Sequence, residues 1–151
     1  MKAVTKFAAD GGLVLGICNG FQILVEAGLL PGALIRNAGL KFVCRDVGLA
    51  TGTQNSPFTA GLGNFVLPVA HGEGQYIADA ATLDMLQADD RIAFRYTDNP
   101  NGSMRDIAGI LSEGRNVLGM MPHPDRAGEP LMGSSDGLVI LKSMVSSLAV
   151  K

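Results

Sequence analysis

Short apolar blocks alternate with polar turns along the chain, and their spacing predicts strands and helices. The run 13–17 (LVLGI) is apolar throughout and follows two glycines, which is typical of a buried strand. Apolar residues over 21–27 fall at helical spacing until Gly28 and Pro31 supply stop signals. Residues 3–10 have the pattern of a helix end. The front of the chain therefore predicts a helix, a strand and a second helix.

The middle of the chain predicts mainly strands. Two β-rich runs, 33–36 and 40–47, are separated by a short turn and predict a β-hairpin. Residues 51–63 are rich in Gly, Asn, Ser and Pro and predict a loop. Asp79 is a suitable cap for a helix that ends near Gln87. The other predicted strands cover 65–69, 92–96, 107–111 and 117–121.

The last helix has the clearest apolar face. Ser135 is a suitable N-cap, and it is followed at helical spacing by Leu138, Leu141, Val145 and Leu148. The uniformly apolar run 13–17 is typical of a strand that, in a parallel sheet, is covered on both faces and paired at both edges. Strands mixed with flanking helices favour an α/β fold, and we expect one domain over 1–151 with a mixed sheet and a β-hairpin insertion.

Composition narrows the functional class. The chain has 151 residues, with 12 basic and 14 acidic side chains and a net charge of −2. No Lys/Arg block is present, which argues against a nucleic-acid or anionic-membrane surface. No apolar run approaches the roughly 18 residues of a membrane span, and the N-terminus is too short and polar for a signal peptide. Two cysteines make no disulfide framework, so a reducing cytoplasm is the expected location.

Cys18 stands in an unusual position, between the predicted strand 13–17 and the helix that follows. Gly16 and Gly20 flank it and allow the sharp turn of a nucleophile elbow, the cysteine counterpart of G-x-S-x-G. A thiol at a helix N-terminus is expected to have a lowered pKa. The alternative is a small buried core residue, because free cysteine is often buried. The elbow pattern alone leaves both interpretations open.

A second candidate group follows the predicted strand 117–121. His123 lies between two prolines, which hold its backbone outside the helical region. Asp125, two residues later, is placed to accept a hydrogen bond from the ring and set its tautomer. With Cys18, these residues indicate a Cys-His-acid triad. The two histidines and two cysteines lack the close spacing of zinc ligands, so no metal is expected.

These motifs resemble the class I (triad) glutamine amidotransferases. The elbow GICNGFQ is followed about a hundred residues later by PHPD. The segments RNAGLKF, VAHGEGQY and GMMPHPDRA…GSSDG occur in the same order as in one branch of the family. That branch is the glutaminase subunits of phosphoribosylformylglycinamidine synthase in purine biosynthesis (PurQ-type). The resemblance extends over nearly the whole chain and implies the flavodoxin-like mixed sheet of that family.

The resemblance implies a role for each matching residue. Cys18 corresponds to the nucleophile that attacks the side-chain amide of glutamine, and His123 to the base that later protonates departing ammonia. The N–H of Asn19 corresponds to an oxyanion donor. Gln22 matches a position that contacts glutamine from the first turn of the helix.

The VAHGEGQY segment matches the loop beside bound glutamine, formed here by His71, Gly72 and Glu73. The alternative is an ordinary glycine-rich turn. The chain departs from the family in two respects. The triad acid is Asp125 where the family usually has glutamate. The family also has a further segment before this point, with the first strands of the sheet and a second oxyanion loop, so the chain is expected to be N-terminally truncated and marginally stable.

The implied activity is hydrolysis of glutamine to glutamate and ammonia through a thioester. The ammonia would pass to a separate synthetase subunit, with a small bridging subunit in the same complex. ATP and Mg²⁺ are expected on that synthetase, because this chain has no Walker-type phosphate loop and no cofactor is expected here. The alternatives are a stand-alone γ-glutamyl cysteine hydrolase and an inactive domain that only binds the synthetase.

Other polar positions carry weaker signals. Cys44 lies in the predicted hairpin and is interpreted as a packing residue. Arg36, Asn37 and Lys41 lie on a glycine-containing turn, and either a partner interface or plain solvation would explain them.

Overall fold

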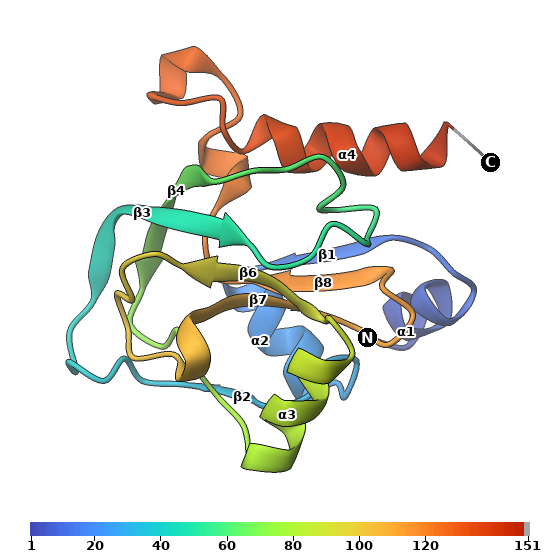
Figure 1. The fold of residues 1–151 in the computed structure, drawn as a ribbon, viewed down its shortest axis with the longest axis horizontal. Helices are drawn as coiled ribbons and strands as arrows, with labels where there is room; N and C mark the ends of the chain where they lie inside the picture. Colours follow the sequence, from blue (N-terminus) through green and yellow to red (C-terminus); the bar gives the residue numbers. More distant parts are fainter. Residues whose placement is uncertain (150–151) are drawn as a thin grey trace.

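A six-stranded mixed sheet organises the chain in the computed structural model, which describes residues 1–149 (Figure 1). The helices are α1 (Lys2–Ala9), α2 (Asn19–Glu26), α3 (Ala80–Ala88) and α4 (Leu138–Leu148). The strands are β1 (Val14–Ile17), β2 (Ala33–Ile35), β3 (Val43–Thr51), β4 (Phe65–His71), β5 (Gln75–Ile77), β6 (Ile92–Tyr96), β7 (Ile107–Leu111) and β8 (Val117–Met120). Three 3₁₀ turns cover Met104–Asp106, Pro124–Arg126 and Pro130–Met132. The last two residues of the predicted domain 1–151 lie outside the described part.

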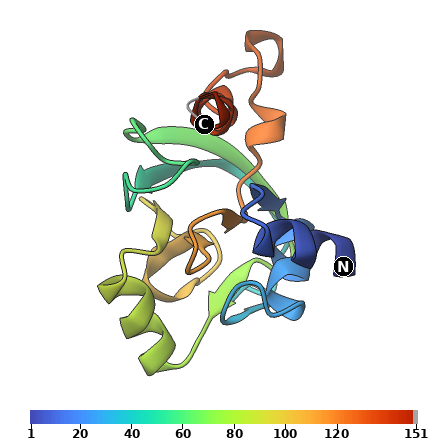
Figure 2. The same ribbon diagram turned by 90° about the vertical axis from the view of Figure 1, so that its right-hand side faces the viewer.

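The strand order of the sheet is β1-β8-β7-β6-β3-β4. Only β1 and β8 are parallel, with Gly16 opposite Gly119, and the other pairs are antiparallel. Figure 2 shows that the sheet is strongly curled, so that β3 and β4 arch over the remaining strands. β1 pairs with β8 alone, so one of its edges has no strand neighbour among residues 1–149.

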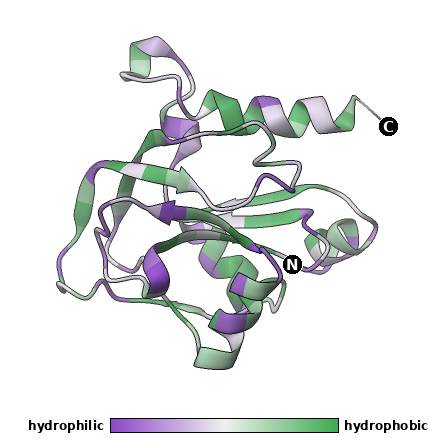
Figure 3. Cartoon of the chain, viewed as in Figure 1, coloured by the Kyte–Doolittle hydropathy of each residue, from purple (hydrophilic) through white to green (hydrophobic). Residues whose placement is uncertain are grey.

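Hydrophobic clusters cover both faces of the sheet, and Figure 3 shows the strands coloured mainly as hydrophobic. One cluster joins β3, β4, β6, β7 and β8 to Phe58 and Ile140. The other packs Phe21 and Leu24 of α2, and Leu83 and Leu86 of α3, against the opposite face. Burial on both sides explains why β7 and β8 are apolar at every position.

The predicted hairpin of 33–36 with 40–47 is wrong. β2 pairs instead with β5 in a separate two-stranded sheet, and β3 pairs with β4 and β6. The two runs have strand propensity, but nothing in their local sequence fixes which strand each one joins. The remaining predicted strands and helices are present, and Asp79 caps α3 by accepting a hydrogen bond from the Thr82 N–H at 2.7 Å.

The predicted start and face of the last helix are also wrong. α4 begins after Gly137, and the Ser135 side chain makes no cap hydrogen bond. Its buried face carries Ile140 and Met144, whereas Val145 and Leu148 are largely exposed. Several faces of this apolar helix could be buried, and packing against the sheet selects one of them.

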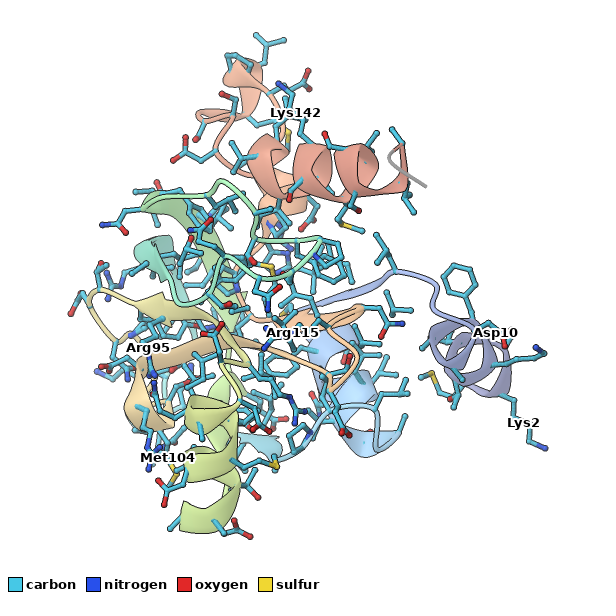
Figure 4. The ribbon with its side chains drawn as sticks, turned by 45° about the vertical axis from the view of Figure 1, so that its right-hand side comes forward. Lys2, Asp10, Arg95, Met104, Arg115 and Lys142 are labelled. Atoms are coloured by element: carbon cyan, nitrogen blue, oxygen red, sulfur yellow. The ribbon has the colours of Figure 1, made fainter. Side chains whose placement is uncertain are left out.

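The Arg115 side chain connects three loop residues by hydrogen bonds. Arg115, labelled in Figure 4, lies in the turn between β7 and β8. Its guanidinium donates to the backbone carbonyls of Asn55, Asp89 and Asp90 at 2.6–3.0 Å. None of the helices within residues 1–149 is long and apolar enough to cross a membrane.

Candidate active site

Cys18 lies at a sharp turn between β1 and α2. Its backbone has φ 52° and ψ −106°, a conformation that non-glycine residues rarely adopt and that costs on the order of 1–3 kcal/mol. Gly16 makes the turn sterically possible, because a Cβ there would collide with Leu24 and lie 2.8 Å from the Gly20 backbone. Strained backbone of this kind is concentrated at functional sites. The geometry is that of the predicted elbow.

The free edge of β4 faces the ends of β1 and β8. The Cys18 thiol donates to the Ala70 carbonyl at 3.9 Å, and the His123 N–H donates to the Pro68 carbonyl at 2.8 Å. Pro68 and Ala70 are two residues apart on one strand, so their carbonyls point the same way and are separated by about 7 Å. The same edge of β4 therefore contacts both the Cys18 thiol and the His123 backbone.

His123 is buried and oriented by one carboxylate. Its Nδ1 lies 3.2 Å from Asp125 Oδ1, and Nε2 has no hydrogen-bond partner among the described residues. With the proton on Nδ1 and donated to Asp125, Nε2 carries an unprotonated lone pair. A buried ring nitrogen without a partner is unusual in a structural histidine and is suited to accepting a proton. The Asp125 side chain is 53% exposed.

Both reactive groups favour their neutral forms. Burial raises the pKa of the Cys18 thiol above its ordinary value, while the Asn19 N–H and the Arg126 guanidinium act in the opposite direction. The predicted lowering of this pKa is therefore wrong, because desolvation outweighs the helix terminus. Burial also lowers the pKa of His123, although the Asp125 carboxylate opposes that shift. The resting pair is a thiol and a neutral imidazole.

The other predicted residues lie on α2 and at the end of β4 with the turn that follows it. The Asn19 N–H acts to lower the pKa of the Cys18 thiol, as a backbone donor beside the sulfur would. The Gln22 amide donates to Glu26 at 3.0 Å along α2. Glu73 is exposed and Gly72 partly buried in the turn after β4. The His71 ring is buried, and both of its nitrogens face asparagine side chains.

Over residues 1–149, no group of three or more His, Cys, Asp or Glu side chains is arranged to hold a metal ion. The chemical groups that the site does offer are a thiol, an oriented imidazole and a backbone N–H, which suit acyl transfer.

Comparison with known proteins identifies the family. A profile of the CobB/CobQ-like glutamine amidotransferase domain matches residues 1–136. The chain belongs to the glutamine amidotransferase family. Phosphoribosylformylglycinamidine synthase subunit PurQ of Koribacter versatilis is 55% identical over 161 residues, covering 99% of this chain and 70% of that relative. The PurQ subunit of Rubrobacter xylanophilus is 54% identical over 153 residues, with the same coverage.

Solved structures of glutamine amidotransferases share this fold. The structure of PurLQS from Thermotoga maritima matches with a TM-score of 0.87 and 41% identity, over 96% of this chain and 66% of that chain. A second glutamine amidotransferase from Thermotoga maritima matches with a TM-score of 0.56 at 15% identity, over 84% of this chain and 46% of that one. The second likeness concerns the fold alone. The family and the mixed sheet flanked by helices that the motifs predicted are confirmed.

Some groups near the reactive residues of this amidotransferase have no signal in the sequence. Ala70 contributes only its carbonyl, which has no signature in the sequence. Asn101 lies in a turn that reads as NPNG, and asparagine is common in turns for conformational reasons alone. Asn37 is expected in solvent or at a partner interface, whereas it is buried and paired with His71, 34 residues away. Only tertiary contacts reveal these residues.

Two alkylating reagents are expected to select different cysteines. Cys44 is exposed, whereas Cys18 is partly buried with a raised thiol pKa. Iodoacetamide at neutral pH is expected to modify Cys44 first, and its rate at Cys18 to keep rising with pH beyond the ordinary thiol pKa of about 8.5. A chloroketone analogue of glutamine is expected to modify Cys18 first. Peptide mass spectrometry over time measures both rates, and affinity labelling of Cys44 would contradict the elbow assignment.

Proposed function

We propose that this chain is a glutaminase that hydrolyses glutamine to glutamate and ammonia through a γ-glutamyl thioester on Cys18. The observations that carry the proposal are the strained backbone of Cys18 at the end of β1 and the buried His123 imidazole, whose Nε2 has no partner among the described residues. High identity to PurQ subunits over nearly the whole chain supports the same reaction class.

The first half of the reaction forms the thioester. His123 Nε2 removes the thiol proton as the Cys18 sulfur attacks the side-chain carbonyl carbon of glutamine. The carbonyl oxygen becomes an oxyanion, and the Asn19 N–H beside the sulfur donates to it. The imidazolium then gives its proton to the amide nitrogen, the C–N bond breaks, and ammonia leaves. Asp125 stabilises the transient positive charge on the ring.

The second half returns the site to its resting form. His123 takes a proton from water, and the resulting hydroxide attacks the thioester carbon. The C–S bond breaks, the sulfur regains the proton from the imidazolium, and glutamate leaves. Atoms and charge balance as one glutamine and one water in, one glutamate and one ammonia out. The neutral resting pair provides both the proton and its acceptor.

The ammonia is consumed by a partner in this proposal. The relatives are named as subunits of phosphoribosylformylglycinamidine synthase, and the solved relative is a PurLQS structure. We assign this chain the same role as those subunits in purine biosynthesis. It delivers ammonia to a synthetase subunit that uses ATP and Mg²⁺, and a small bridging subunit belongs to the same complex. Unpaired cysteines agree with a cytoplasmic location.

Turnover measurements separate this proposal from its rivals. Glutamate release by the purified chain is measured with and without a synthetase subunit. Activity that rises when the synthetase is added supports the proposal. Full activity without synthetase indicates a stand-alone γ-glutamyl hydrolase, and no activity in either case indicates a domain that only binds its partner.

Replacing Asp125 with asparagine is expected to lower kcat by about 10²-fold, less than the 10⁴-fold measured for a buried triad acid. The loss is smaller because the Asp125 carboxylate is half exposed, so water partly solvates the imidazolium. Asp125→Glu keeps the charge and is expected to retain most activity. Steady-state glutaminase kinetics measure both variants. Equal kcat in the two would remove Asp125 from the mechanism.

A further inference from the structure

A buried polar network lies under the turn that follows β4. The side chains of Asn37, His71 and Asn101 are 1%, 4% and 2% exposed. They come from three segments that are far apart in the chain: the loop after β2, the last residue of β4 and the loop between β6 and β7. Buried polar groups cost free energy unless each one is paired, so the pairing pattern indicates what they hold.

The pairing is centred on Asn37. Its Nδ2 donates to the carbonyls of Lys41 and His71 at 2.8 and 2.9 Å, which fixes the orientation of the amide. Its Oδ1 accepts from the Gly74 N–H at 3.0 Å and faces His71 Nδ1 at 3.1 Å. All four hydrogen-bonding positions of the amide are therefore occupied.

The same pattern sets the tautomer of His71. Because Asn37 Oδ1 can only accept, the proton lies on Nδ1. Asn101 Nδ2, which also donates to the Gly74 carbonyl at 2.8 Å, faces His71 Nε2 at 3.4 Å. Burial and the nearby His123 lower the pKa of His71, in agreement with a neutral ring. The neutral His71 ring thus donates from Nδ1 to Asn37 and accepts at Nε2 from Asn101.

These bonds hold the backbone of residues 71–74. Asn37 bonds to the His71 and Gly72 carbonyls and to the Gly74 N–H. Asn101 donates to the Gly74 carbonyl. Gly74 must be glycine here, because a Cβ would lie 2.5 Å from the His71 ring. The segment starts next to Ala70, whose carbonyl contacts the Cys18 thiol. The network therefore holds the turn that begins one residue after the carbonyl in contact with the reactive cysteine.

We propose that His71, with Asn37 and Asn101, is a positioning residue for glutamine rather than a residue whose ring contacts it. The ring points inside and holds the 71–74 turn, with exposed Glu73 and partly buried Gly72, directly after Ala70, whose carbonyl contacts the Cys18 thiol. This inference rests on the proposed glutaminase function. It replaces the direct substrate contact that the family resemblance implied for His71.

Two variants of His71 test the role. His71→Leu removes both hydrogen bonds, whereas His71→Asn retains a donor near the position of Nδ1. We expect His71→Leu to raise the KM for glutamine by about tenfold or more, the equivalent of one to two lost hydrogen bonds, with a smaller change in kcat. His71→Asn is expected to be intermediate. Labelling of Cys18 by the chloroketone analogue should slow in parallel, while its iodoacetamide rate stays within about twofold of wild type.

A matched control separates positioning from general instability. Thr53 is also buried and hydrogen-bonded, to Asp90 at 2.5 Å, but it belongs to the loop after β3. Thr53→Val is expected to lower the melting temperature and leave the glutamine KM unchanged. A KM within twofold of wild type in both His71 variants, or an equal rise in Thr53→Val, would overturn the inference and leave the glutaminase proposal standing. A wild-type chain that neither turns over glutamine with the synthetase nor labels at Cys18 would overturn both.

Discussion

Replacing Cys18 with alanine is expected to abolish glutamine-dependent amidine synthesis in the reconstituted complex and to leave ammonia-dependent synthesis intact. The alanine has no sulfur to form the thioester, and a lost nucleophile costs about 10⁶-fold in kcat in a serine protease. The synthetase chemistry belongs to a separate chain and needs only the nitrogen donor. Both activities are measured by amidine formation, with glutamine or an ammonium salt as the source.

Cys44→Ala is the matched control for that measurement. Cys44 lies on β3 opposite Ala70 and is exposed, and it has no place in the proposed chemistry. Its removal is expected to leave both activities unchanged. If Cys18→Ala also lost ammonia-dependent synthesis, the residue would be needed for folding or docking rather than for the thioester.

Replacing His123 with alanine is expected to lower the glutaminase kcat by about 10⁴-fold or more, with little change in the KM for glutamine. The resting thiol has a raised pKa, so at neutral pH it depends on a base to lose its proton. Without the imidazole, neither thioester formation nor ammonia departure has a proton carrier. Steady-state kinetics at pH 7 and at pH 9 measure the loss.

The pH dependence of this variant identifies the role of the ring. Raising the pH increases the thiolate fraction at Cys18, so the deficit of His123→Ala is expected to shrink at pH 9. His71→Asn provides the comparison, because its defect lies in KM and not in proton transfer. A His123→Ala enzyme with normal kcat at pH 7 would contradict the assignment of His123 as base.

Several elements of the fold were predictable because their signals are local. The apolar run 13–17 with its flanking glycines predicted β1, the elbow and α2. The prolines around His123 and the carboxylate of Asp125 predicted an oriented ring. The contact between His123 Nδ1 and Asp125 Oδ1, at 3.2 Å, is present. These predictions depend on backbone sterics and on residues within two or three positions of each other.

Other elements were not predictable because they depend on distant partners. The run 33–36 pairs with β5 and not with 40–47, a choice made by packing across the molecule. The buried face of α4 is Ile140 and Met144, although another apolar face satisfied the same periodicity. The direction of the Cys18 pKa shift follows burial, which a local pattern does not reveal.

The sequence by itself determined the family, the elbow and the identity of the groups proposed to react, because each is encoded by residue type at short spacing. Only the tertiary structure decided how they meet. The curl of the sheet brings the β4 edge against Cys18 and His123, and it buries both groups enough to keep them neutral. The proposed role of His71 also rests on tertiary contacts, since its partners Asn37 and Asn101 lie 34 and 30 residues away. Hydrogen bonds between such distant residues exist only after the chain has folded, and no local pattern encodes them.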